Sequence, residues 1–101
     1  MLAQVSVVPL GVGTSVSNYV ADALDVIDKS GLDYRLSAMG TVIEGDWDQV
    51  MGTLKKVHDR IMNESDRLLM YVSLDDRKDK EQPIDAKVKV VEKALGKPLK
   101  K

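Results

Sequence analysis

The segment Arg67–Asp75, RLLMYVSLD, limits the possible folds more than any other part of the chain. Its run of five apolar residues, from Leu68 to Val72, puts large side chains on both faces of one strand, because successive strand residues point to opposite faces. A strand of this kind is covered on both sides. We therefore expect a sheet with helices on one face. A second copy of the chain is the natural cover for the other face, which would expose Leu69 and Tyr71 in a monomer.

The remaining pattern predicts the elements around this strand. Alternation predicts a first strand over Leu2–Val8 that stops at Pro9, and two shorter strands over 34–38 and 41–44. Met39 and Gly40 separate the short strands, which form either a tight hairpin or one long strand bent at Gly40. Apolar spacing predicts three helices. The first spans 16–30 between an N-cap at Thr14 or Ser15 and Gly31, the second runs from its cap Asp46 to about 63–65, and the third runs from Pro83 at its first position to Gly96.

This order of elements is typical of one fold class. Strand, helix, strand, strand, helix, strand and helix match the ferredoxin-like βαββαβ arrangement with an extra C-terminal helix, an α+β fold with a four-stranded antiparallel sheet. The length of 101 residues fits a single domain, 1–101. If Val5, Val7, Leu36 and Ala38 face the helices, a second, mixed face is formed by Gln4, Ser6, Arg35, Ser37, Tyr71 and Ser73.

Composition argues against several functions. Fifteen Lys and Arg against sixteen Asp and Glu give a net charge of -1, which does not favour binding to nucleic acid or to a membrane. The chain has no cysteine and a single histidine, His58, so we expect no metal site and no cofactor. The glycine-containing GVGTSVS, from Gly11, lacks the third glycine of a dinucleotide-binding loop. The N-terminus resembles neither a signal peptide nor a membrane span, so we expect a cytoplasmic protein.

Glu44 is the residue that local structure explains least. Asp46 accounts for the start of the second helix, whereas Glu44 lies two residues earlier and belongs by alternation to the strand. It shares a face with Val42 and lies opposite Thr41 and Ile43. Parity alone does not say which face meets the helices. On the face away from the helices, the carboxylate would need a donor or a cation.

Three segments together resemble the thiamine-binding protein family. They are VPLGVGTSVSNYV near the N-terminus, MGTVIEG from Met39 and RLLMYVSLDDRKD from Arg67, in the family's order and spacing. The resemblance implies a ferredoxin-like fold and a homotetramer, a dimer of dimers whose sheets pack together. It also implies a pocket for thiamine or its hydroxymethylpyrimidine part near subunit contacts, and it does not imply catalysis.

A ligand of this kind suits several side chains. The carboxylate of Glu44 can bind an aminopyrimidine through charge-assisted hydrogen bonds. Neutral hydrogen bonds are expected from Thr41, Ser6 and Ser37. Trp47 either stacks on a ring or joins the core. Arg77 matches the family's D-x-R segment, and it either contributes to the ligand site or forms a salt bridge or an intersubunit contact. Two alternatives stay open: a small ferredoxin-like enzyme with Glu44 as general base, and an oligomeric interaction module without a ligand.

Overall fold

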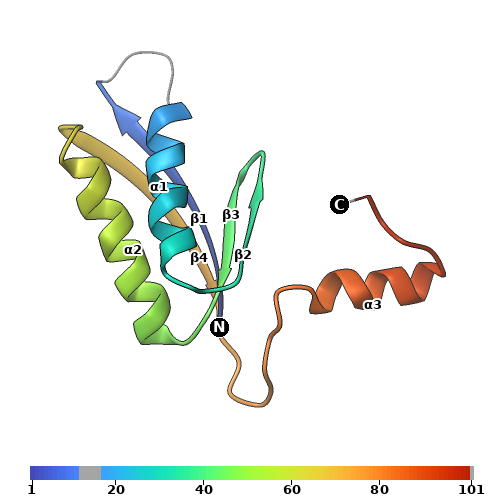
Figure 1. Cartoon of the computed structure of the whole chain (residues 1–101). Coiled ribbons are helices and arrows are strands. Elements are labelled where there is room, and N and C mark those ends of the chain that lie inside the picture. The colour runs from blue at the N-terminus through green and yellow to red at the C-terminus, as the bar shows by residue number, and fades with distance from the viewer. Residues whose placement is uncertain (12–16, 101) are drawn as a thin grey trace.

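The computed structural model describes residues 1–11 and 17–100 (Figure 1). In this part of the chain four strands and three helices follow the predicted order, which confirms the ferredoxin-like α+β fold. Their bounds are β1 Leu2–Leu10, α1 Ser17–Lys29, β2 Tyr34–Ser37, β3 Gly40–Glu44, α2 Trp47–Met62, β4 Arg67–Asp75 and α3 Ala86–Leu95. The strands form one antiparallel sheet in the order β2-β3-β1-β4. The predicted caps Thr14 and Ser15 lie outside the described residues.

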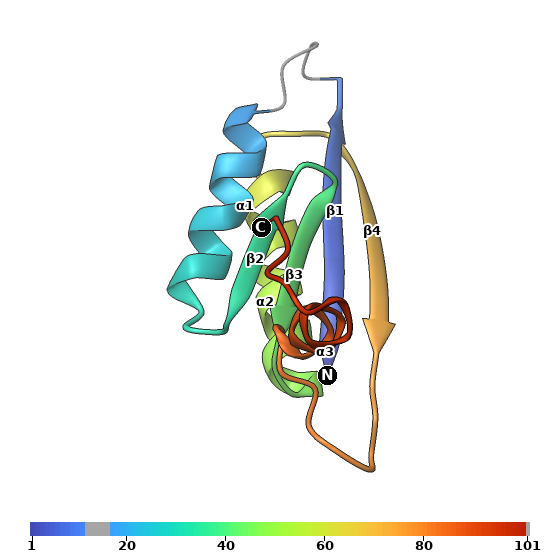
Figure 2. The ribbon, with the colours of Figure 1, turned by 90° about the vertical axis from the view of Figure 1, so that its right-hand side faces the viewer.

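One face of the sheet packs on α1 and α2, and we call the opposite face the outer face (Figure 2). Register identifies the two faces, because the buried Val5 lies opposite Thr41 on β3 and opposite Val72 on β4. The core lies between the helices and the sheet and consists of Ala3, Val5, Ala23, Ile27, Ile43, Val50, Leu54, Val57 and Ile61. Burial of each valine, leucine or isoleucine side chain of this core stabilises the fold by about 1.5 to 3 kcal/mol.

The first strand extends beyond its predicted end. Pro9 was expected to stop it, but β1 continues to Leu10 and Pro9 is a buried residue paired opposite Leu68. Pairing of β1 with β3 ends at Val5, so within the described residues one side of β1 has no partner strand at Pro9. A proline without an N–H group is tolerated on such an open edge.

The hairpin and the second helix agree with their local signals. Ser37 pairs with Gly40, so β2 and β3 form a tight hairpin and not a bent strand. Asp46 is the N-cap of α2, and its carboxylate accepts the N–H of Gln49 at 2.8 Å. The side chain of Gln49 in turn accepts the N–H of Asp46, which completes a capping box.

The last strand and the last helix differ from expectation in their surroundings. β4 has its predicted bounds but is an edge strand, and Tyr71 and Val72 are exposed in the single chain. The described part of this chain therefore does not cover both faces of β4, as the sequence had led us to expect. The helix α3 begins at Ala86 and not at Pro83, because the carbonyl of Pro83 accepts the N–H of Ala86 in a preceding turn. Gly96, with a φ of 71°, ends it as predicted.

Candidate functional site

A cavity of about 240 Å³ lies between α1 and the sheet, where the β2–β3 hairpin meets β1. Its walls are mainly apolar and include Val5, Val20, Leu24, Ile27, Leu36 and Met39. Ser6, Ser37 and Thr41, three of the predicted binding residues, also line it. Concave apolar sites with a few polar groups are typical of small-molecule binding.

The three hydroxyl residues contribute to this cavity in different ways. Thr41 is buried on the helix-facing side of β3, and its hydroxyl has no hydrogen bond to any residue that the structure describes. The hydroxyl of Ser37 donates to the carbonyl of Gly40 at 3.0 Å and so closes the hairpin turn. Ser6 pairs with Tyr71, so its side chain belongs to the outer face and its backbone lines the cavity. Thr41 is therefore the hydroxyl available to a bound molecule.

Glu44 lies on the other side of the sheet. It pairs with Leu2 on the outer face, whereas Thr41 belongs to the face that meets the helices. Its Oε1 accepts the backbone N–H of Ile84 at 2.5 Å, so the donor that a half-buried carboxylate needs comes from the segment before α3. Glu44 and Thr41 consequently cannot both contact a small ring bound in the cavity.

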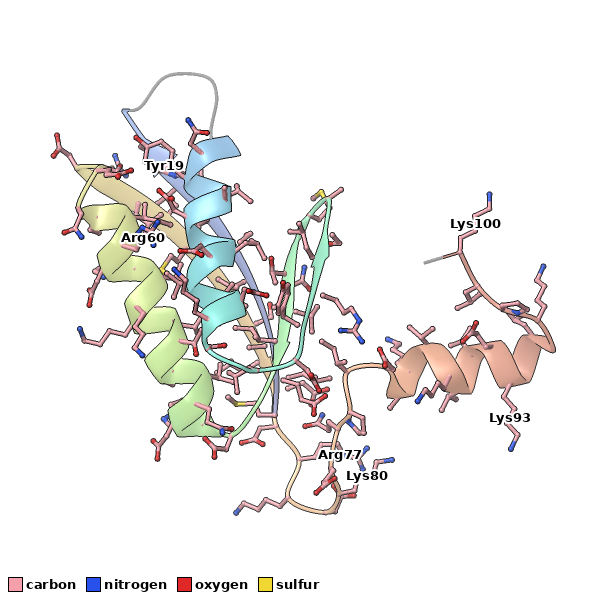
Figure 3. The ribbon with its side chains drawn as sticks, viewed as in Figure 1. Tyr19, Arg60, Arg77, Lys80, Lys93 and Lys100 are labelled. Carbon is pink, nitrogen blue, oxygen red and sulfur yellow. The ribbon has the colours of Figure 1, made fainter. Side chains whose placement is uncertain are left out.

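Trp47 and Arg77 also lie away from the cavity. Trp47 is the first residue of α2 and is 57% exposed, so the alternative that placed it in the core is wrong. Arg77 lies in the loop after β4 (Figure 3), and its Nη2 donates to Asp79 at 2.6 Å. The salt bridge that was one of the expected roles of Arg77 is therefore present within the chain.

A second concave region, about 570 Å³, was not predicted from the sequence. This groove lies between the outer face at Arg35 and Val42 and the residues Val88, Lys89 and Glu92 of α3. Arg35 forms an ion pair with Asp85 at 3.1 Å at one end of it. The apolar stripe of the last helix indicated a packing surface, but nothing local indicated where the helix would lie.

Ionised side chains hold α1 against α2 away from both concave regions. Arg60 on α2 binds Asp22 at 3.0 Å and Asp25 at 3.2 Å on α1. Hydrogen bonds from Lys29 and then from Arg60 lower the pKa of Asp25 below its ordinary value. The predicted helix residue His58 is exposed, with its Nδ1 3.0 Å from Asp59. Within the described residues no cluster of three or more His, Cys, Asp or Glu could hold a metal ion.

These features define a small ferredoxin-like α+β protein with an apolar cavity under its first helix. Among the described helices, none is long and apolar enough to cross a bilayer. The chain belongs to the thiamine-binding protein family, because the family model described as thiamine-binding protein matches residues 3–92.

Relatives of the chain agree with this membership. A UPF0045 protein of Methanocaldococcus jannaschii is 43% identical over 90% of this chain and 91% of its own length. A UPF0045 protein of Eremothecium gossypii is 38% identical over 94% of this chain and 92% of its own length. The crystal structure of the Methanocaldococcus protein superposes with a TM-score of 0.83 over 89% of this chain and 93% of that one. A domain of unknown function from Bacillus cereus is 26% identical and superposes with a TM-score of 0.78, over 86% of this chain and 85% of that one.

Proposed function

We propose that this chain binds thiamine or its hydroxymethylpyrimidine part and does not transform it. The observation that carries the proposal is the hydroxyl of Thr41 at the cavity wall, which has no hydrogen-bond partner among the described residues. A ligand can therefore bond to this hydroxyl without displacing a side chain or backbone partner, and membership of the thiamine-binding family supports an aminopyrimidine as this ligand.

The size and lining of the cavity favour the pyrimidine part. Drug-sized ligands occupy pockets of about 300 to 1,000 Å³, and this cavity of about 240 Å³ is smaller. A single flat ring fits such a space between the side chains of Val5 and Leu24, where the hydroxyl of Thr41 either accepts from its amino group or donates to one ring nitrogen. The thiazolium ring of whole thiamine would then lie toward the open side of the cavity.

The position of Glu44 supports binding without catalysis. A general base must come within hydrogen-bond reach of the proton that it removes. The carboxylate of Glu44 lies on the outer face and binds the N–H of Ile84, away from a ring next to Thr41. Of the six predicted residues we therefore propose Thr41 as the direct contact. Ser37 shapes the hairpin and Ser6 supplies backbone, whereas Glu44, Trp47 and Arg77 lie away from the cavity.

We also propose that the chain assembles as a homotetramer, a dimer of dimers that pack through their outer faces. The outer face carries Tyr71, which is 60% exposed in the single chain, beside the partly buried Leu69 and the exposed Val8. A contiguous exposed patch of this kind is typical of an interface between copies. The cytoplasmic location stays a prediction.

Calorimetric titration with hydroxymethylpyrimidine and with thiamine tests the ligand. We expect both to bind, and Thr41→Val to weaken both by about tenfold, since a net hydrogen bond contributes about 0.5 to 1.5 kcal/mol. Thr53→Val is the matched control, because Thr53 is equally buried but its hydroxyl bonds to Gln49 within α2. It should leave the affinity unchanged.

Two results would contradict the proposal. A flat titration with both compounds would favour the interaction module that binds no ligand. Recovery of a chemically altered pyrimidine after long incubation, detected by mass spectrometry, would favour the enzyme.

A further inference from the structure

The first strand of the sheet continues past the hairpin with one edge open. The register of β1 with β3 ends at the pair Val5 and Thr41, whereas its register with β4 runs on through Leu10. Figure 2 shows β1 extending beyond the tip of the hairpin. Within the part of the chain that the structure describes, β1 therefore has a partner strand on only one side over residues 6–10.

The alternation of hydrogen bonds decides which residues of β1 use this edge. In an antiparallel sheet a residue directs its N–H and its C=O to the same neighbouring strand, and successive residues alternate between the two neighbours. The N–H of Gly45 donates to the carbonyl of Met1 at 3.1 Å, so the groups of Met1, and by alternation those of Val5 and Val7, point to the side of β3. A Cβ atom added at Gly40 of β3 would lie 3.0 Å from the carbonyl oxygen of Val5, which agrees with this direction.

The backbone of Val7 meets the cavity at this open edge. Continued by two residues, the register of Val5 with Thr41 would place Val7 opposite Met39, which lies in the hairpin turn and not in β3. Val7 and Met39 both line the cavity. Among the described residues no hydrogen-bond partner faces the N–H or the C=O of Val7 on this edge. Pro9, the next residue on the same edge, has no N–H group, so Val7 supplies the one backbone donor that residues 6–10 direct to this edge.

We infer that Val7 recognises the amidine edge of the ligand, which is a ring nitrogen next to an amino group. The ring nitrogen accepts the N–H of Val7 and the amino group donates one hydrogen to its C=O, as a residue of a neighbouring strand would. The second hydrogen of the amino group is then free to bond to Thr41. The ligand thus continues the sheet at the position where β3 ends. This contact rests on the proposed function, because it requires a ring bound in the cavity.

These two backbone groups define the ligand class more sharply than the hydroxyl of Thr41 does. A hydroxyl both donates and accepts, so by itself it can bind to an amino group, a carbonyl or a ring nitrogen. The N–H and the C=O of Val7 cannot exchange roles, and together they require an acceptor and a donor side by side. We therefore expect the cavity to select flat heterocycles that have an amino group next to a ring nitrogen, and aminopyrimidines belong to this class.

Amide hydrogen exchange, followed residue by residue by NMR in the full-length chain, tests this contact. In the free protein the amide of Val7 should exchange at least about tenfold faster than that of Val5, which faces β3. Saturating hydroxymethylpyrimidine should slow the exchange of Val7 by at least about tenfold. The amide of Tyr34 is the matched control, because alternation from the bond between Glu44 and Asp33 turns it to the open edge of β2, outside the cavity. Its exchange rate should not change.

An analogue of hydroxymethylpyrimidine with a methyl group in place of the amino group provides a second measurement. In calorimetric titration it should bind at least about tenfold more weakly than hydroxymethylpyrimidine, both to the wild type and to Thr41→Val, because the carbonyl of Val7 accepts from the amino group in either protein. Equal affinity of the Thr41→Val protein for the two compounds would assign the amino group to Thr41 alone and overturn the contact with Val7.

The remaining outcomes separate this contact from the proposed function. Binding of hydroxymethylpyrimidine without slower exchange at Val7 would refute the contact and leave the proposed function standing. A Val7 amide that already exchanges as slowly as that of Val5 in the free protein would refute it too, because the edge would be occupied. If hydroxymethylpyrimidine and thiamine both fail to bind, the proposed function is wrong, and 2-aminopyridine, which has the same amidine edge, decides on Val7. Slower exchange of Val7 with this compound would support the contact, and unchanged exchange would refute it.

Discussion

Gly40 stands where the β2–β3 hairpin comes closest to β1. Its φ is 155°, and a Cβ atom added there would lie 3.0 Å from the backbone carbonyl oxygen of Val5. Neither the backbone conformation nor the space suits a side chain. We expect Gly40→Ala to lower the free energy of unfolding by about 1 to 3 kcal/mol, because the hairpin must move away from β1. Urea unfolding measures this loss.

Gly52 provides the control for this substitution. It lies in the exposed middle of α2, where an added Cβ would have no atom within 4 Å among the described residues. Gly52→Ala should raise the free energy of unfolding by about 0.5 to 1 kcal/mol, as helix propensity predicts. If the two substitutions had the same effect, the close approach at Gly40 would have no energetic consequence.

Glu44 shows what a single residue's sequence context can and cannot predict. Alternation correctly placed it in a strand, away from the capping role that Asp46 fills. The face it occupies depends on the pairing of β3 with β1, which joins residues about 40 positions apart. Its partner, the N–H of Ile84, is equally distant in sequence. No local pattern encodes either contact, so the direction of this side chain could not be predicted.

At the scale of elements, the sequence was sufficient where residues close together along the chain determine the start or end of a helix or strand. The cap at Asp46, the bounds of β4 and the end of α3 at Gly96 all follow from residues within one turn or one strand. The extension of β1 through Pro9 depends on where β3 stops pairing. The exposure of α3 depends on where the loop after β4 leads. Both are tertiary effects, and both were missed.

The contact between α1 and α2 predicts how stability depends on pH. The pKa of Asp25 is below its ordinary value of 3.8, first because of Lys29 and then because of Arg60. A group with a lowered pKa in the folded state contributes its full stabilisation above its unfolded value, and loses it as the pH falls through the folded value. The pKa of Asp59 is lowered in the same direction, chiefly by Lys55. We therefore expect stability to fall on acidification below about pH 4.

Asp25→Asn tests this acid dependence. The asparagine cannot titrate, so the urea midpoint should vary less between neutral pH and pH values below about 4 than in the wild type. Asp48→Asn is a suitable control, because Asp48 has no ion pair among the described residues. An Asp25→Asn protein with the full wild-type acid dependence would place the titrating groups elsewhere.

At the scale of the whole molecule, the cavity is the feature that the sequence could describe only in part. Ser6, Ser37 and Thr41 were predicted as binding residues, and they line one cavity because β1, the hairpin and α1 converge there. Hydroxyl groups near glycine turns can be recognised along the chain. The packing of the fold decides which hydroxyl has a hydrogen-bond partner among the described residues. Ser37 bonds to the carbonyl of Gly40, whereas Thr41 does not form such a bond, and this difference cannot be seen in the sequence.

The outer face of the sheet is also a property of the whole molecule. Substitution of two aromatic residues tests whether copies of the chain associate through it. Tyr71 and Trp47 are almost equally exposed in the single chain, at 60% and 57%, but only Tyr71 belongs to the outer face. Aromatic residues at the centre of an interface contribute about 2 kcal/mol or more to association. Tyr71→Glu should therefore shift the protein to smaller species in light scattering after size-exclusion chromatography.

Trp47→Glu introduces the same charge on an equally exposed aromatic position and should leave the mass unchanged. Both variants should keep the circular dichroism of the wild type, because neither side chain is buried in the folded chain. Equal dissociation of the two variants would indicate that added negative charge, and not the outer face, controls assembly. An unchanged mass for Tyr71→Glu would show that copies associate through a different surface, and the exposed strand β4 would then need another cover.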